Sequence, residues 1–285
     1  MKKVTMQNLK NKVAVITGAA EGIGKAIAIR AAAEGMKLVL ADINAEKLQA
    51  TVAEFEAQGV EVIGQRVDVA DSTQMDAFAD AAFARFGNVH LLVNNAGVAI
   101  SRPVWETTLE DWQWVMGVNF YGVTNGLRAF IPRMLANGDE GHIVNTASVA
   151  GLLSQPSTAA YNASKHAVVT VSEGLYFDLQ LRQAKLKVSV LCPAWVKTGI
   201  ADAERNRTVG DHIDFSKVDA VNQFTAGMMH KAVAKGISVD KVADDVFNAI
   251  ATEQFYILTH PKIKSLIQTR MEDILLQRNP TLAGL

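Results

Sequence analysis

The sequence predicts an α/β protein in which a doubly wound, mostly parallel sheet is covered by helices on both faces. Short β-branched apolar segments alternate with longer alanine-rich segments, and glycines directly follow three of the longer ones. Continuous apolar runs are typical of strands that are buried on both faces of a parallel sheet. Strands that alternate with helices build such a sheet through right-handed crossovers.

Seven apolar segments are predicted to be its strands. They are Val13–Thr17, Leu38–Asp42, Val60–Val67, Val89–Asn94, His142–Thr146, Lys187–Leu191 and Phe255–Thr259. Seven segments with apolar residues three or four positions apart are predicted helices. These are Gly22–Glu34, Ala45–Ala57, Ser72–Phe86, Leu109–Ala136, Ala159–Arg182, Val239–Thr252 and Lys262–Gln277. Gly35, Gly59 and Gly87 stand where a helix commonly ends in a left-handed residue.

The alternation is interrupted between Thr198 and about Ser238, where glycine, charged and apolar residues mix and no strand is evident. No shift in composition and no proline-rich linker marks a second unit. We therefore expect residues 1–285 to form a single domain with a long insertion near its C-terminal end.

Composition excludes several classes of function. The chain has 285 residues, of which 49% are hydrophobic and 20% charged, as in a globular protein. A net charge of −1 argues against nucleic acid as a partner. No apolar run approaches the roughly 20 residues of a membrane span. The only cysteine, Cys192, rules out an internal disulfide and is consistent with a cytoplasmic protein.

A glycine-rich turn follows the first predicted strand and opens the first predicted helix. Gly18, Gly22 and Gly24, with Ile23 between the last two, have the spacing G-x3-G-x-G. Glycines allow the backbone to approach a pyrophosphate closely, and the helix N-terminus presents free N–H groups to it. This pattern predicts a dinucleotide site, and a tight turn without a ligand is the alternative.

Asp42 ends the second predicted strand, 18 positions after Gly24. A carboxylate at this position can accept hydrogen bonds from both ribose hydroxyls of NAD, and it repels the 2′-phosphate of NADP. The position therefore favours NAD. Two alternatives remain open: Asp42 only caps the next helix, or Lys25 and Arg30 allow NADP as well.

Tyr161 and Lys165 lie four residues apart in a predicted helix, so their side chains share one face. A free phenol has a pKa of about 10, and a nearby ammonium favours its ionised form. Such a tyrosine is a candidate general base that takes a hydroxyl proton while a hydride leaves the adjacent carbon. An exposed pair on a helix is the alternative.

Together these motifs resemble the short-chain dehydrogenase/reductase family over about residues 10–200. The matching residues follow the family's order: Gly18, Gly22, Ile23, Gly24, Asp42, Asp68, Val69, Asn94–Gly97, Asn119, Ser148, Tyr161, Lys165 and Pro193–Thr198. The resemblance implies a seven-stranded Rossmann-type fold. It also implies NAD or NADP as the cofactor and chemistry without a metal. Asp42 makes NAD the preferred cofactor, with NADP possible.

The resemblance also implies roles for four catalytic residues. Tyr161 would be the general acid/base, and Ser148 would donate a hydrogen bond to the substrate oxygen. Lys165 would lower the pKa of the tyrosine and hold the nicotinamide ribose. Asn119 would hold a water that links Lys165 to solvent, and a role in bonding only the backbone is the alternative.

The remaining matching residues would contact the cofactor. Asp68 and Val69 would flank the adenine, and Asn95 and Gly97 would lie at the adenosine ribose. Pro193, Val196 and Thr198 would position the nicotinamide amide and the phosphates. The chain departs from the family at Ala194, where glycine is common, which leaves the local backbone angles open.

In the family, the insertion at about 198–238 forms a lid over the substrate. We expect Leu152, Leu153, Gln155 and Trp195 to line the substrate pocket, and Trp105, Trp112 and Trp114 to pack between helices. The mixed charges of the insertion favour a largely apolar, uncharged alcohol or ketone. About 25 residues follow His260. This C-terminal extension, about 260–285, resembles that of a subgroup in which some members oxidise bulky secondary alcohols. Covering the active site and covering a neighbouring subunit are its two alternative roles.

The expected activity is NAD(P)-dependent interconversion of a secondary alcohol and a ketone, that is, oxidation of CH–OH. An NADPH-dependent reductase of an activated carbonyl and a non-catalytic dinucleotide sensor are the alternatives. The family commonly forms dimers or tetramers. We expect a homodimer or homotetramer assembled through the helices 109–136 and 159–182.

Overall fold

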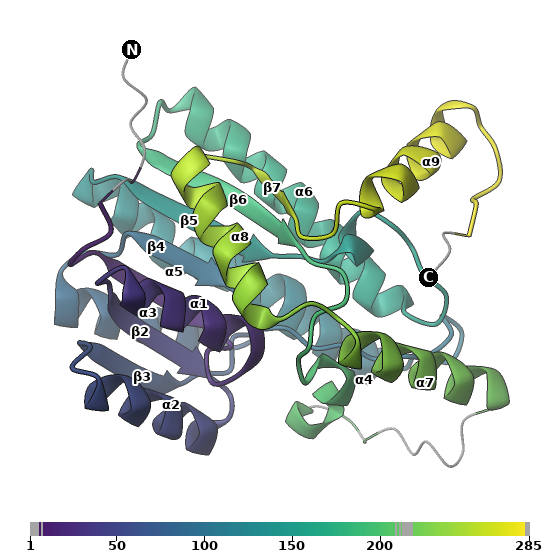
Figure 1. Ribbon diagram of the computed structural model, residues 1–285, viewed down its shortest axis with the longest axis horizontal. Coiled ribbons are helices and arrows are strands. Elements are labelled where there is room, and N and C mark those ends of the chain that lie inside the picture. Colours follow the sequence, from purple (N-terminus) through teal and green to yellow (C-terminus); the bar gives the residue numbers. More distant parts are fainter. Residues whose placement is uncertain (1–5, 7, 209, 211, 213–218, 283–285) are drawn as a thin grey trace.

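The computed structural model describes residues 6, 8–208, 210, 212 and 219–282. Within these residues, seven parallel strands form one sheet in the order β3-β2-β1-β4-β5-β6-β7, which confirms the predicted fold class (Figure 1). The strands are β1 (Val13–Thr17), β2 (Lys37–Asp42), β3 (Val62–Arg66), β4 (Leu91–Asn94), β5 (Gly141–Thr146), β6 (Leu186–Cys192) and β7 (Tyr256–Leu258). The sequence order reverses between β1 and β4, and ligands bind at such switch points in open α/β sheets.

Helices cover both faces of the sheet. Helices α1 (Gly22–Ala33), α2 (Ala45–Ala57) and α8 (Val239–Thr252) pack on one face, where alternate strand residues such as Ile16 and Leu40 are buried. Helices α3 (Ser72–Phe86), α5 (Gly122–Asn137) and α6 (Ala159–Leu181) pack on the other, against Val15 and Val39. Neighbouring strand residues thus point into the hydrophobic cores on the two opposite faces of the sheet. This explains why the strands are apolar throughout.

The predicted helix 109–136 is not continuous. It consists of α4 (Leu109–Met116), a π-helical turn (Gly117–Tyr121) and α5. A π-helical turn often marks a functional site. At the ends of three other helices, Gly35, Gly59 and Gly87 have φ of 76°, 75° and 75°, as predicted.

The segment 198–238 contains helical structure that the sequence did not reveal: a 3-10 segment (Ile200–Asn206) and helix α7 (Ala220–Ala234). Residues 209, 211 and 213–218 of the predicted lid lie outside the described residues, as do 1–5, 7 and 283–285. Helix α9 (Ile263–Leu275) follows β7. Figure 1 shows α7 and α9 at the right of the view, at the end of the sheet to which the strand arrows point. No helix among the described residues is long and apolar enough to cross a membrane.

Candidate active site

A cavity lies beyond the C-terminal ends of β1, β4, β5 and β6, beside the 3-10 segment Ile200–Asn206. Its wall contains all of the predicted site residues except Gly24 and Asn119. These are Gly18, Gly22, Ile23, Asp42, Asp68, Val69, Asn95, Gly97, Ser148, Tyr161, Lys165, Pro193, Val196 and Thr198. The fold thus brings together residues that are far apart in the sequence.

The glycine-rich turn forms one end of this cavity. Gly18 and Gly22 have φ of +63° and +60°, a region that favours glycine. A Cβ built on Gly24 would lie 2.0 Å from the carbonyl oxygen of Gly18, so this helical residue must also be glycine. The N-cap of α1, Glu21, accepts no side-chain capping hydrogen bond, and no acidic residue occupies the first turn. These features fit a pyrophosphate at the N-terminus of α1.

The carboxylate of Asp42 is held at the edge of the cavity by two backbone groups. Its Oδ2 accepts from the N–H of Ala20 at 3.0 Å, and its Oδ1 accepts from the N–H of Asn44 at 2.9 Å. Asn44 is the residue that caps α2, since its side chain accepts from the N–H of Lys47. The alternative that Asp42 is merely the helix cap is therefore wrong. Each oxygen of Asp42 retains a lone pair for a further donor.

The basic side chains that line the cavity near Asp42 are not those that the sequence suggested. Lys25 pairs with Glu54 at 2.7 Å and Arg30 pairs with Glu34, away from the cavity wall. Lys47 and Arg205 line the cavity instead. Sequence reasoning missed both, because no local motif marks them.

Glu21 binds both of these cations. Its carboxylate pairs with Lys47 at 2.7 Å and also with Arg205 of the 3-10 segment. Burial raises the pKa of Glu21, but the hydrogen bonds to Lys47 and Arg205 outweigh it, so that the pKa lies below its usual value. The ion pair with Arg205 joins the glycine-rich turn directly to the 3-10 segment.

The residues after β3 and β4 shape the opposite wall. The side-chain amide of Asn95 donates to the carbonyl oxygens of Thr17 and Gly18 at 3.1 and 3.2 Å and so fixes the start of the glycine-rich turn. Asp68 accepts from the N–H of Ala70 at 3.0 Å. It therefore caps a turn and lines the cavity at the same time.

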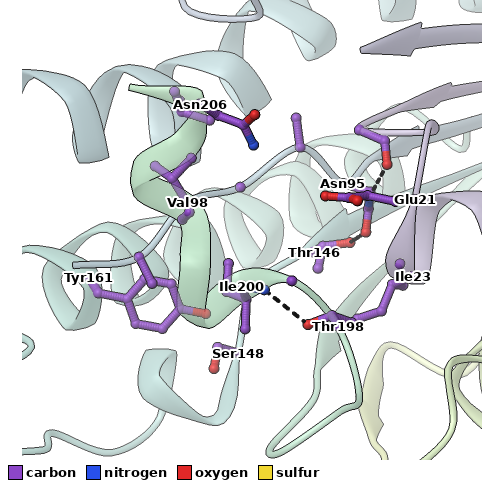
Figure 2. Close-up of a pocket in the computed structure, with 18 of the residues that line it drawn as sticks. Glu21, Ile23, Asn95, Val98, Thr146, Ser148, Tyr161, Thr198, Ile200 and Asn206 are labelled. Atoms are coloured by element: carbon purple, nitrogen blue, oxygen red, sulfur yellow. Dashed lines mark hydrogen bonds between the residues drawn. The ribbon is translucent and has the colours of Figure 1, made fainter. Parts of the chain in front are cut away.

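Ser148, Tyr161 and Lys165 meet in the middle of the cavity wall. Figure 2 shows the Ser148 hydroxyl beside the Tyr161 ring, next to Ile200 of the 3-10 segment. The ammonium of Lys165 lies 5.7 Å from the centre of the Tyr161 ring, and it donates to the carbonyl oxygen of Thr146 at 2.9 Å. Ser148 accepts from the N–H of Ala150 at 3.1 Å, which fixes its side chain.

Burial dominates the ionisation of these groups. It raises the pKa of Tyr161 above 10, and hydrogen bonding by Ser148 lowers it only in part. Burial also lowers the pKa of Lys165 from 10.5 to about 8. The expected acidic phenol therefore does not arise from the protein's own groups, because burial outweighs the hydrogen bond with Ser148.

Asn119 lies in the π-helical turn and is completely buried behind the wall. Its amide donates to the carbonyl oxygen of Val98 and to Ser164 Oγ, at 2.9 and 3.0 Å, and its Oδ1 accepts from the N–H of Val98 at 2.8 Å. This is the backbone-bonding role considered above. A Cβ built on Gly97 would lie 3.4 Å from both Asn119 Oδ1 and Lys165 Nζ, so both atoms border one small space.

Several expectations for the pocket walls need correction. Gln155 and Trp195 do line the cavity. Leu153 is instead 2% exposed and packs with Ile263 of α9, because the C-terminal helix covers this loop. Leu152 packs in the core beside α6.

The tryptophans also differ from expectation. Trp105 is 81% exposed and does not pack between helices. Trp112 packs in the cluster around Trp114 and Val115, as expected. Trp114 is buried in that cluster, but it also lines the cavity, which the sequence did not reveal.

Comparisons with known proteins agree with this geometry. Residues 12–208 match the family model described as short chain dehydrogenase. The chain is 35% identical over 280 residues to a "CLA biosynthesis dehydrogenase/reductase" of Lactiplantibacillus plantarum, covering 96% of this chain and 97% of the relative. It is 33% identical to a 1-deoxy-11-beta-hydroxypentalenate dehydrogenase of Streptomyces avermitilis, covering 94% of this chain and 91% of the relative.

The structure is also similar to solved structures. A short-chain dehydrogenase/reductase from Burkholderia phymatum, crystallised in complex with NAD, superimposes with a TM-score of 0.94 at 49% identity. That comparison covers 98% of this chain and all of the other. The matched family model, the relatives that span almost the whole chain and the seven-stranded fold lead to one conclusion. The chain belongs to the short-chain dehydrogenase/reductase family of oxidoreductases.

Proposed function

We propose that this protein is an NAD-preferring dehydrogenase that interconverts a secondary alcohol and a ketone. The observation that carries the proposal is the meeting of Ser148, Tyr161 and Lys165 in the same cavity as the glycine-rich turn and Asp42. Tyr161, which can take up and release a proton, thus lies in the same cavity as the residues that fit a dinucleotide. The name of the Streptomyces relative, a hydroxypentalenate dehydrogenase, supports oxidation of a CH–OH group.

The balance of the reaction assigns a role to each side chain. The carbinol C–H bond breaks and its electron pair leaves as hydride, while the hydroxyl proton passes to the Tyr161 oxygen, which has first released its own proton towards Lys165. When bound, oxidised NAD supplies the carbon that accepts the hydride and a positive ring charge. Ser148 stabilises the negative charge that develops on the substrate oxygen. The products are a ketone, NADH and one proton.

The proton that Tyr161 releases needs a path to solvent, and Lys165 and Asn119 provide the first groups of that path. Both amide hydrogens of Asn119 are used, but its Oδ1 has a free lone pair that borders the same space as Lys165 Nζ. A water held there would pass the proton from Lys165 towards solvent. Lys165, with a pKa of about 8, can lose and regain a proton near neutral pH.

NAD is preferred over NADP because of the charges at the adenosine end. Asp42 faces the cavity, and Lys47 and Arg205, which also line it, are both paired with Glu21. A 2′-phosphate would meet the Asp42 carboxylate and would have to compete with Glu21 for its counter-ions. The protein is proposed to act in the cytoplasm as a single-domain homo-oligomer. Exposed Phe177 and Leu181 on α6 support assembly through that helix.

A spectrophotometric screen of secondary alcohols and ketones with NAD, NADH, NADP and NADPH tests the proposal. The Tyr161→Phe variant is expected to lose at least about a thousandfold in kcat and to bind NAD as tightly as the wild type. Tyr121→Phe, at an exposed tyrosine of the π-helical turn, is the matched control and should retain activity. Full turnover by Tyr161→Phe, or no turnover of any alcohol by the wild type, would refute the proposed function.

A further inference from the structure

Asn206, the last residue of the 3-10 segment, presents an unused amide to the cavity. It lines the cavity, and Figure 2 shows its amide extending towards the space between Val98 and Asn95. Ala203, three positions earlier, also lines the cavity, as expected because residues with this spacing share one face of a 3-10 helix. The side chain of Asn206 is only half-buried and has no hydrogen-bond partner among the residues that the structure describes. Its two N–H donors are therefore accessible to a ligand.

The chain on both sides of Asn206 is held by an anchored arginine. Arg205 pairs with Glu21 of the glycine-rich turn, and it also donates to two nearby backbone carbonyl oxygens at 2.6 and 2.7 Å. On the other side, Arg207 is only 1% exposed and pairs with Asp111 of α4 at 2.7 Å. Asn206 thus lies between two fixed points, so its side chain loses little conformational freedom when it binds a ligand.

The position of Asn206 identifies the part of the ligand that it can reach. Figure 2 shows its amide well separated from the hydroxyl groups of Ser148 and Tyr161, which face the reacting carbon in the proposed function. Asn206 directly follows Arg205, which binds Glu21, and Glu21 is the N-cap of α1. The N-terminus of α1 fits the pyrophosphate of a dinucleotide. The nearest ligand group is therefore this diphosphate and not the alcohol.

The charges around the N-terminus of α1 favour a neutral donor at this place. Lys47 and Arg205 are both paired with Glu21. A diphosphate that recruited either cation would have to break an ion pair. The amide of Asn206 can donate to an anionic oxygen without giving up a partner. Hydrogen bonds to charged acceptors are about twice as strong as those between neutral groups.

We infer that Asn206 is a cofactor-binding residue whose amide N–H donates to the diphosphate of NAD. The segment after β6 then holds the middle of the cofactor, opposite the glycine-rich turn. This inference rests on the dinucleotide site of the proposed function, but it does not depend on the alcohol chemistry.

Two variants of Asn206 test the inference. Asn206→Ala removes the donor, and Asn206→Asp replaces it with a carboxylate of the same size that repels a phosphate. Neither change removes a hydrogen bond that the structure describes. Asn248→Asp is the matched control, because Asn248 is an exposed residue of α8 and does not line the cavity. Dissociation constants are measured for NADH by fluorescence and for ADP-ribose by calorimetry. ADP-ribose contains the diphosphate but lacks the nicotinamide.

Asn206→Ala is expected to weaken the binding of both NADH and ADP-ribose about 10- to 100-fold, as for the loss of a hydrogen bond to a charged group. Asn206→Asp should weaken both further, because two anionic groups then face each other. The control should bind both as the wild type does. Unchanged dissociation constants in Asn206→Ala would overturn the inference. A loss confined to NADH would also overturn it, because the contact would then involve the nicotinamide.

Turnover separates this inference from the proposed function. At saturating NAD, Asn206→Ala should leave the KM for the alcohol unchanged. A raised KM with unchanged affinity for NADH would show that the amide binds the substrate, and the inference would fail while the proposed activity holds. Weakened binding of NADH and ADP-ribose in a protein that oxidises no alcohol would instead refute the proposed activity and leave the role of Asn206 supported.

Discussion

Replacing Lys165 with methionine tests the energetics of the site, because Lys165 is a cation buried to 3% exposure. Its pKa falls from 10.5 to about 8 on burial, which corresponds to about 3 kcal/mol against folding while the lysine is charged in both states. Methionine has a similar length and no charge. It also removes the donor to the Thr146 carbonyl, at a cost of about 1 kcal/mol. We therefore expect Lys165→Met to be inactive and yet more stable than the wild type by about 2 kcal/mol at pH 7.

The pH dependence has a definite sign. Below about pH 8, the lysine is protonated in both the folded and the unfolded chain, so the whole penalty is present. Between about pH 8 and 10.5, the unfolded chain binds more protons, so the wild type gains stability as the pH rises. The advantage of the methionine variant therefore shrinks over this range. Cys192, whose pKa burial raises to about 12, affects both proteins and cancels in the difference.

Urea unfolding at pH 7, 8 and about 9.5, with both proteins at equal concentration, measures this difference. A methionine variant that is less stable than the wild type at pH 7 would refute the reasoning. So would a stability difference that stays constant between pH 7 and 9.5, because the penalty would then not come from the charge of Lys165.

Three further changes test other parts of the structure. Asp42→Ala should lower kcat/KM with NAD roughly 10- to 100-fold and relax the preference over NADP, and an unchanged ratio of the two would contradict the ribose assignment. Gly24→Ala should abolish NAD binding by calorimetry, because its Cβ would lie 2.0 Å from the Gly18 oxygen, whereas Gly174→Ala, with nothing within 4 Å, should bind NAD normally. Asp111→Asn should destabilise the protein by about 2 kcal/mol in urea unfolding, since the buried carboxylate pairs with both Arg102 and Arg207, and a loss below about 0.5 kcal/mol would contradict this.

The sheet and most helices could be predicted because their signals are local. Buried strands are apolar throughout, and Gly35 follows α1 with the positive φ that its position predicts. Helix α7 was missed because its apolar residues do not form one buried face: Phe224 and Met228 are exposed, whereas Val233 is buried. The π-helical turn was also missed, since the apolar pattern of the predicted helix 109–136 continues through it.

The candidate site could be predicted where each residue belongs to a motif at the end of a strand or in a helix. Contacts between distant segments have no such signal. Glu21 and Arg205 are 184 positions apart, and nothing near either one indicates that they pair. The pKa of Tyr161 was misjudged for a related reason, since burial depends on the whole fold and outweighs the hydrogen bond with Ser148.

Following deuterium from the carbinol carbon of the alcohol to NADH tests the central claim most directly. A secondary alcohol carrying deuterium on the carbinol carbon is oxidised with NAD, and the NADH is examined by mass spectrometry. If the cavity aligns the alcohol with the cofactor while Tyr161 removes only the hydroxyl proton, every NADH molecule contains the deuterium and the solvent contains none. Deuterium in the water, with unlabelled NADH, would contradict the account.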